Sequence, residues 1–462
     1  MTTNEKGDFS KGPVFSTIIK LALPIILAEL VQVTYNIVDR IYIGRIPDCG
    51  TDALTGMGLV LPFITIINAF ANLCSYGGAT LSAIARGEKD DKKAQSFMEN
   101  AFTLLVISGL VLMVIFLVFS KQLVMWLGGD EVTTFYACEY FDIYVLGTVF
   151  VLISLGMNSF ITMQGYSVIG MWTVLIGAIL NIVLDPVFIY VFNMGVKGAA
   201  VATVISQACS ALWVIIFLRR KDIPLRFTRF RFNGGEIVEI LKLGVSGFMF
   251  KATNSITQGI VNKTLRIFGG ALGSLYIAAM SIIFSVREVV QQPVNGFIEG
   301  AKPVLSYNYG AKDYWRVNKT ITYMHLASFA YTTFMWALIM LFPKTIIGIF
   351  SNDPALIEVA IPCLRTFYCV FFFMSLQTAG QNTFVALKHS GYSVTFSLLR
   401  KVGLIAPLTL LLPRLGLGVM GVFWAEVASE IIGGSACHLT MYFKVWKPIK
   451  EKMKEQQRLT NQ

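Results

Sequence analysis

Twelve apolar segments constrain this chain more than any other feature, because each is long enough to cross a lipid bilayer as a helix. A membrane-spanning helix needs about 20 mostly apolar residues. The segments lie near 15–43, 54–82, 97–120, 136–160, 168–192, 197–218, 237–265, 272–300, 320–342, 357–386, 394–412 and 418–443. Charged residues make up 14% of the chain, against about 25% in soluble domains. The sequence therefore predicts an all-α polytopic membrane protein with twelve transmembrane helices.

Basic residues gather in alternate connections between these segments. The connections at 85–93, 219–231 and 310–319 and the C-terminal stretch 444–458 are rich in Lys and Arg, whereas the opposite connections carry about one basic residue each. By the positive-inside rule both termini are predicted to be cytoplasmic. The net charge of +11 is then a feature of the membrane surface, where it faces anionic lipid, and not a sign of nucleic-acid binding.

The two halves of the chain resemble each other at a shift of about 222–226 residues. The matching pairs are "IIKLALP" (18–24) with "ILKLGVS" (240–246), "RGEKD" (86–90) with "YGAKD" (309–313), "GGD" (128–130) with "SND" (351–353), "GYS" (165–167) with "GYS" (391–393), and "GVKG" (195–198) with "GVMG" (418–421). Six spans per repeat predict two parallel copies, an arrangement typical of secondary transporters. We expect an N-lobe (1–218), a cytoplasmic linker (219–236), a C-lobe (237–446) and a basic cytoplasmic tail (447–462).

Polar residues recur on single faces of several spans. The stripes are Glu29, Gln32, Asn36 and Asp39 on the first span, Lys251, Asn254, Gln258 and Asn262 on the seventh, Asn68 and Asn72 on the second, Gln291 and Asn295 on the eighth, Ser154 and Asn158 on the fourth, and Gln377 and Gln381 on the tenth. Such groups can be hydrogen-bonding contacts between helices. Because the stripes match between repeats, they also predict a water-accessible substrate cavity between the lobes. Glu29 and Lys251 occupy equivalent places, so we expect them to pair in one of two conformations.

Asp185 lies within the apolar stretch "AILNIVLDPVFIY" (178–190), one helical turn after Asn181 and directly before Pro186. A charged side chain at the centre of a membrane helix costs about 2.5–3.5 kcal/mol, so such residues are functional candidates. Pro186 removes a backbone N–H and is expected to bend the helix there. At the repeat shift, the second half carries apolar residues in place of Asn181, Asp185 and Asp39. The aspartates are either structural braces or a titrating site, and we favour the titrating site.

Four stretches, taken together and in this order, resemble the multidrug and toxin extrusion (MATE) transporters, in their bacterial DinF-like or MepA-like branch. They are "YNIVDRIYIG" (35–44), "NIVLDP" (181–186), "GVKGAAVAT" (195–203) and "SYNYGAKD" (306–313), and the resemblance covers about 15–445. It implies cation-coupled antiport of amphipathic compounds across a bacterial plasma membrane. It implies a cation-coupling site at Asp39, Asn181, Asp185 and Thr203, and a substrate pocket near Gln32, Met157 and Asn158. Some relatives place acids on the seventh and tenth spans, where this chain has Lys251, Gln377 and Gln381.

The leading interpretation is a secondary antiporter that exports amphipathic, cationic drugs or metabolites by alternating access. Burial and a second carboxylate both favour the protonated form of an aspartate, so a proton is the first choice of coupling ion and sodium the second. The cavity candidates are Glu29, Gln32, Asn36, Asn68, Met157, Asn158, Lys251, Gln258 and Gln291. We expect no metal and no cofactor, and partners limited to a small-molecule substrate and membrane lipid, with the protein acting as a monomer.

Two other functions are weaker. A flippase or exporter of lipid-linked or polar metabolites would share the repeat, but a strongly cationic cavity would favour it and this one is mixed. A membrane-embedded enzyme lacks support, because no nucleophile–base constellation and no paired carboxylates with a histidine are visible. The seven cysteines show no CxxC spacing, and no P-loop is present to bind ATP. The prediction is therefore a transporter and not an enzyme.

Overall fold

A computed structural model describes residues 8–47 and 49–460 of the protein, apart from the side chains at 251, 252, 254–256 and 460. The described residues form helices and connections with no β-strand. The first half contains α1 (Val14–Gly44), α2 (Gly50–Gly87), α3 (Asp91–Trp126), α4 (Glu131–Leu146), α5 (Thr148–Met163), α6 (Ser167–Pro186), η2 (Val187–Val191) and α7 (Gly195–Leu218). This confirms the predicted all-α class for the first six spans.

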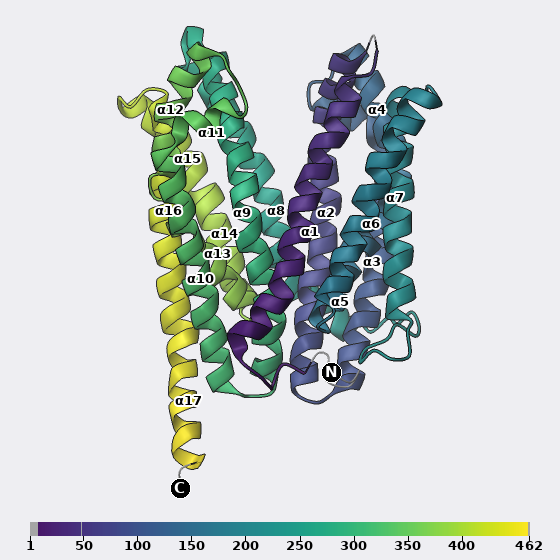
Figure 1. Ribbon diagram of the computed structural model, residues 1–462, viewed down its shortest axis with the longest axis vertical. Coiled ribbons are helices and arrows are strands. Elements are labelled where there is room, and N and C mark those ends of the chain that lie inside the picture. The colour runs from purple at the N-terminus through teal and green to yellow at the C-terminus, as the bar shows by residue number, and fades with distance from the viewer. Residues whose placement is uncertain (1–7, 48, 461–462) are drawn as a thin grey trace. The chain divides into compact units, whose positions relative to one another are not determined.

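The second half begins with α8 (Gly234–Phe268). It contains η3 (Gly270–Leu272), α9 (Gly273–Gly310), α10 (Tyr314–Leu341), α11 (Pro343–Gly348), α12 (Pro354–Tyr368), α13 (Phe373–Ala386), α14 (Ser390–Leu398), η4 (Leu399–Ile405), α15 (Ala406–Leu411), η5 (Leu412–Leu415), α16 (Met420–Met441), η6 (Tyr442–Trp446) and α17 (Lys447–Thr460). The α16, η6 and α17 segments follow one another without a loop, and Figure 1 shows α17 continuing the line of α16.

Each of the twelve predicted spans falls on helix. Among the described residues, eight helices are long and apolar enough to cross a membrane, or ten if each of two bent pairs is one span. The bent pairs are α4 with α5, at 57°, and α12 with α13, at 48°. The remaining two spans are α8 and α16, which carry more polar residues, including Glu426 and Glu430 on α16.

The chain divides into two compact units. An N-terminal unit contains Ile19–Phe248, and a C-terminal unit contains Gly12–Ile18 and the residues from Met249 onward. The division falls inside α8, whereas the sequence placed the linker at 219–236. In the N-terminal unit α2 packs against α3, α4 and α5, and α7 packs against α4, α5 and α6. In the C-terminal unit α9 contacts α10, α12 and α13, and α16 contacts α12, α13 and α15.

The repeated motifs mark equivalent helix starts in the two units. Asp90 and Asp313 accept hydrogen bonds from backbone N–H groups in the first turns of α3 and α10, and Asp130 and Asp353 do the same for α4 and α12. Acidic side chains at this position satisfy N–H groups that lack a partner within the helix. Each pair is 223 residues apart, so this spacing relates the two repeats in three dimensions.

The "GYS" match does not follow that spacing. Ser167 begins α6 and Ser390 begins α14, so Ser167 corresponds to Ser390 and not to Ser393. The backbone before each start is left-handed, at Gly165 (φ +87°) and at Lys388 (φ +65°). The two "GYS" motifs are therefore three residues out of register with the repeat. The helix starts give the correct alignment of the two halves.

Two glycines allow α2 and α8 to approach closely within the N-terminal unit. A Cβ atom on Gly77 would lie 2.0 Å from the carbonyl oxygen of Ile240, and one on Gly244 would lie 1.7 Å from that of Leu73. No side chain larger than hydrogen fits at either position unless a backbone moves. Small residues serve this purpose in membrane helix packing generally, because close backbones gain van der Waals contact.

Candidate coupling site in the N-terminal unit

Four side chains predicted from three distant stretches of sequence meet inside the N-terminal unit. Asp39 comes from α1, Asn181 and Asp185 from α6, and Thr203 from α7. Their exposed fractions are 4%, 1%, 0% and 3% respectively. Polar groups that are this deeply buried must find partners inside the protein, because water cannot reach them.

Asn181 joins the other members of the site. Its Nδ2 donates hydrogen bonds to Asp185 Oδ1 at 3.1 Å and to Thr203 Oγ1 at 3.2 Å. The Thr203 hydroxyl donates in turn to the carbonyl oxygen of Ala199 at 3.0 Å. Because Asn181 and Asp185 are one turn apart on α6, the helix itself sets their spacing. Thr203 then connects α7 to the same face of α6.

The two carboxyl groups are close neighbours. Asp39 and Asp185 lie close enough to interact electrostatically, and Asp39 Oδ1 and Asp185 Oδ2 find no donor among the described residues. Two ionised carboxylates close together inside a membrane protein repel each other strongly. The pair therefore favours a state in which one proton is bound. The arrangement can therefore hold a proton, and a cation could replace it.

Tyrosines surround this pair and were not among the predicted residues. The side chains of Tyr35 on α1 and Tyr140 on α4 lie near Thr203 and Asp39. Tyr140 stacks on Tyr144, with ring centroids 5.9 Å apart and an interplanar angle of 18°. Their spacing of four residues was visible in the sequence and places both on one helix face. Tyrosines are neutral and common in apolar segments, so that signal alone did not mark them.

The chain continues past Pro186 as a π-helical segment. Proline has no N–H to donate, and the following residues adopt the wider helix of η2, in which Phe192 N donates to Val187 O at 2.9 Å. In this segment the Tyr190 hydroxyl donates to the carbonyl oxygen of Tyr42 on α1 at 2.8 Å. The altered helix directly after Asp185 thus connects α6 to the helix that carries Asp39.

The predicted cavity residues of the N-terminal unit have mixed environments. Glu29, Gln32, Asn36, Asn68 and Asn158 are half-buried, whereas Met157 is fully buried and does not face open space. Gln32 Nε2 lies 3.4 Å from Asn36 Oδ1 on the same face of α1, as the stripe predicts.

The C-terminal unit holds the other cavity candidates. Gln258 is exposed and Gln291 is half-buried. The side chain of Lys251 lies outside the described residues, so its pairing with Glu29 stays a prediction.

One repeat-matched polar pair joins helices. Asn158 Nδ2 donates to the carbonyl oxygen of Gly170 at 3.2 Å, and Gln381 Nε2 donates to that of Ser393 at 3.1 Å. The two donors are 223 residues apart, and so are the two acceptors. In both units this bond connects the second half of a bent span to the next helix. For these two residues a structural role in helix packing accounts for the repeat match.

The C-terminal unit contains a buried ion cluster in place of an aspartate site. Arg287 on α9 and Arg400 on η4 both contact Glu426 and Glu430 on α16. Arg400 Nη2 lies 2.7 Å from Glu426 Oε1 and 3.1 Å from Glu430 Oε1, and Arg287 Nη2 lies 3.2 Å from Glu430 Oε1. Glu426 stands 223 residues after Thr203, at the equivalent place in the repeat.

The cluster includes one of two neighbouring charges on the eighth span. Arg287 is paired within its own unit, whereas Glu288 is exposed. Two guanidinium groups contact the two carboxylates, so this cluster differs from the pair of Asp39 and Asp185.

Comparison with known proteins identifies the family of this chain. A profile of the MatE family matches residues 24–187 and 252–411, which is most of the chain. The multidrug export protein MepA of Staphylococcus aureus is 26% identical over 444 residues, covering 94% of this chain and 95% of its own. MepA of Staphylococcus haemolyticus is 26% identical over 434 residues, with 92% of each chain covered.

Solved structures show the same fold. An outward-facing multidrug resistance MATE family transporter of the MOP superfamily superposes with a TM-score of 0.89 at 21% identity, covering 97% of this chain and 99% of that one. A MOP superfamily transporter from Pyrococcus furiosus also gives 0.89, at 22% identity, with 96% and 99% covered. The fold and the family match together define a duplicated, twelve-helix membrane transporter. The chain belongs to the MatE family, whose members are transporters and not enzymes.

Proposed function

We propose that this protein is an antiporter that exports small amphipathic organic cations, with Asp39 and Asp185 as the residues that bind the coupling ion. The observation that carries the proposal is the burial of two neighbouring carboxyl groups, a pair that favours one bound proton. A site that holds a proton when closed and loses it when wetted can link proton movement to a change of conformation. The relatives named multidrug export proteins support drug-like substrates.

The proton is the first candidate for the coupling ion. Release of the shared proton would leave two adjacent negative charges, a state that favours either re-protonation or an incoming cationic substrate. Exchange of one proton for one monovalent cation is electroneutral, so the pH gradient would drive it and the membrane potential would not. Opening to the outside would load the proton, and opening to the inside would release it.

Sodium is the second candidate, because the site also offers neutral oxygen atoms. The Oδ1 of Asn181 is buried without a hydrogen-bond partner among the described residues, and the Thr203 hydroxyl lies beside it. Together with the carboxylates these are ligands suited to a hard cation. Sodium would replace the shared proton, so the two ions would compete for one site.

The setting of this activity is proposed as a bacterial plasma membrane, with both termini on the cytoplasmic side and a monomeric chain as the working unit. The orientation rests on the basic connections, and the membrane on the Staphylococcus relatives. No cofactor is needed for this mechanism beyond the coupling ion.

The test is export of a panel of cationic dyes from vesicles under an imposed pH or sodium gradient. Asp39→Asn and Asp185→Asn should each lose gradient-driven export, because an amide cannot share and release the proton. Asp52→Asn, which changes an exposed aspartate at the start of α2 in the same way, should export like the wild type. Wild-type export with unchanged pH dependence in both site variants would make the aspartates structural braces.

A further inference from the structure

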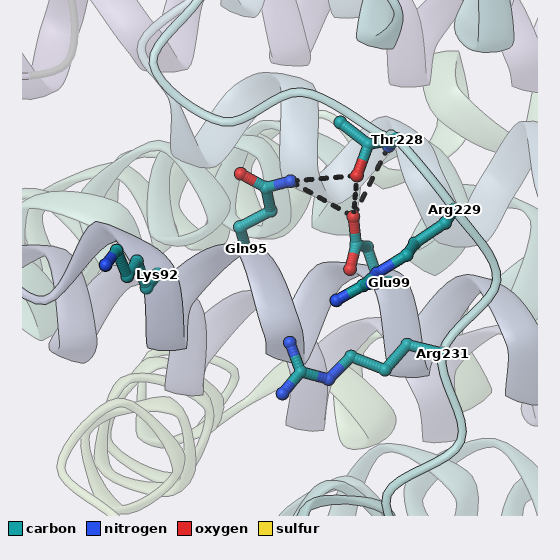
Figure 2. A pocket seen from close by; sticks show the side chains of 6 residues that line it. All are labelled: Lys92, Gln95, Glu99, Thr228, Arg229 and Arg231. Atoms are coloured by element: carbon teal, nitrogen blue, oxygen red, sulfur yellow. Dashed lines mark hydrogen bonds between the residues drawn. The ribbon is translucent and has the colours of Figure 1, made fainter.

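A basic pocket lies on the N-terminal unit, where the segment after α7 crosses the start of α3. Its volume is about 380 Å³. It is lined by Lys92, Gln95 and Glu99 of α3 and by Thr228, Arg229 and Arg231 of the crossing segment. In Figure 2, Arg229 and Arg231 extend from the crossing segment toward α3, and Gln95 and Glu99 of α3 lie beside Thr228. None of these lining residues belongs to the proposed coupling site.

The wall formed by Thr228, Arg229 and Arg231 is held in place by α3. Glu99 Oε1 accepts hydrogen bonds from Gln95 Nε2 at 3.0 Å and from the backbone N–H and hydroxyl of Thr228. Arg231 N donates to Thr103 Oγ1 at 3.2 Å, so the backbone is fixed on both sides of Arg229. A pocket with a fixed wall loses little conformational entropy when a ligand binds.

The pocket carries an excess of positive charge. The acidic residue of the pocket, Glu99, is buried and accepts hydrogen bonds from Thr228 and Gln95. Within the described part of the chain, Lys92, Arg229 and Arg231 form no ion pair with a carboxylate, although the same chain pairs several other cations. Three cations around one cavity suit an anion, and two arginines favour the oxygens of a phosphate.

Exposed aromatic rings adjoin the basic residues. Phe230 and Phe232 alternate with Arg229 and Arg231 and are 63% and 74% exposed. Phe230 packs against Phe102 of α3, with ring centroids 5.4 Å apart, so the aromatic group is fixed to the apolar part of that helix. Exposing aromatic rings to water is unfavourable, whereas aromatic and basic side chains together are typical of a membrane interface.

We propose that this pocket binds the phosphate group of an anionic membrane phospholipid, whose acyl chains lie along Phe230 and Phe232. The basic cavity accounts for the headgroup, and the exposed rings select a lipid over a soluble phosphate. This site is independent of the proposed coupling ion and substrate. It would fix the segment between the two repeats to the membrane surface at the start of α3.

Native mass spectrometry of the detergent-solubilised full chain tests the proposal, with titration by phosphatidylglycerol or phosphatidylcholine. The wild type should retain phosphatidylglycerol preferentially. Arg229→Gln combined with Arg231→Gln should weaken that binding at least about tenfold. The matched control is Arg226→Gln combined with Lys221→Gln, which removes two exposed charges from the same segment outside the pocket and should bind like the wild type.

Two further arms separate the possible sources of the phosphate. Inorganic phosphate and glycerol 3-phosphate should compete weakly, and Phe230→Ser with Phe232→Ser should reduce lipid binding while leaving all pocket charges in place. Equal loss of binding in the pocket and control variants would overturn the site in favour of diffuse surface charge. Full competition by inorganic phosphate would overturn the lipid assignment. Thermal unfolding of each variant verifies that it is folded.

Discussion

Removing Arg287 should destabilise the C-terminal unit severely, because it breaks a balanced ion cluster inside the protein. Arg287, Arg400, Glu426 and Glu430 carry two positive and two negative charges, and their side chains are 12%, 5%, 9% and 1% exposed. Arg287→Met leaves two carboxylates in contact with one guanidinium group, and so unbalances the charges of these four contacting side chains. Breaking a buried pair from one side costs about 3–5 kcal/mol. Thermal unfolding should then shift down by on the order of 10 °C.

A second variant distinguishes charge imbalance from lost packing. Arg287→Met combined with Glu430→Gln removes one charge of each sign and keeps the contact of Arg400 with Glu426 at 2.7 Å. Because the remaining cluster is again neutral, the double variant should recover most of the lost stability. Replacing a buried ion pair as a whole is often close to neutral, in contrast to removing one partner.

Thermal unfolding of the purified protein, followed by circular dichroism, measures all of these variants. Arg414→Met is the matched control, since Arg414 is an exposed arginine of the same unit and its loss should change little. The reasoning is refuted if Arg287→Met unfolds at the temperature of Arg414→Met. It is also refuted if the double variant is less stable than the single one.

Three further predictions concern packing, capping and orientation. Gly244→Ala should lower the unfolding temperature strongly because its Cβ would meet a backbone oxygen at 1.7 Å, whereas Gly259→Ala on the same helix, with nothing within 4 Å, should be neutral or slightly stabilising. Hydrogen bonds from Thr133 lower the pKa of Asp130, so its stabilisation of the first turn of α4 should be lost as the pH falls through that pKa. Hydrogen exchange in that turn should show this pH dependence, and Asp130→Asn should abolish it. In a background without native cysteines, Asp130→Cys should react with an impermeant maleimide from outside and Asp90→Cys only from inside; the reverse pattern would invert the orientation.

The sequence alone was enough to predict the spans and the repeat. The length of an apolar segment and its residue type decide whether a helix can cross a bilayer, because unpaired backbone groups are not tolerated there. The repeat was predicted from similar short motifs in the two halves of the chain. In the structure, Asp90 and Asp313 cap equivalent helices. Helical periodicity also placed Asn181 and Asp185 on one face. Their proximity to Asp39 and Thr203 came from the family resemblance, since periodicity says nothing about contacts between helices.

The tertiary structure alone decided which charges pair and which polar residues pack. Arg287 and Glu426 are 139 residues apart, and in the sequence each was only a charge inside an apolar span. Asn158 resembled a cavity residue because it matched Gln381, yet both make equivalent bonds between helices. A buried polar group is satisfied by whichever partner the packing of distant helices brings within hydrogen-bonding distance. That partner depends on helix contacts across the fold, which the local pattern of residues does not contain.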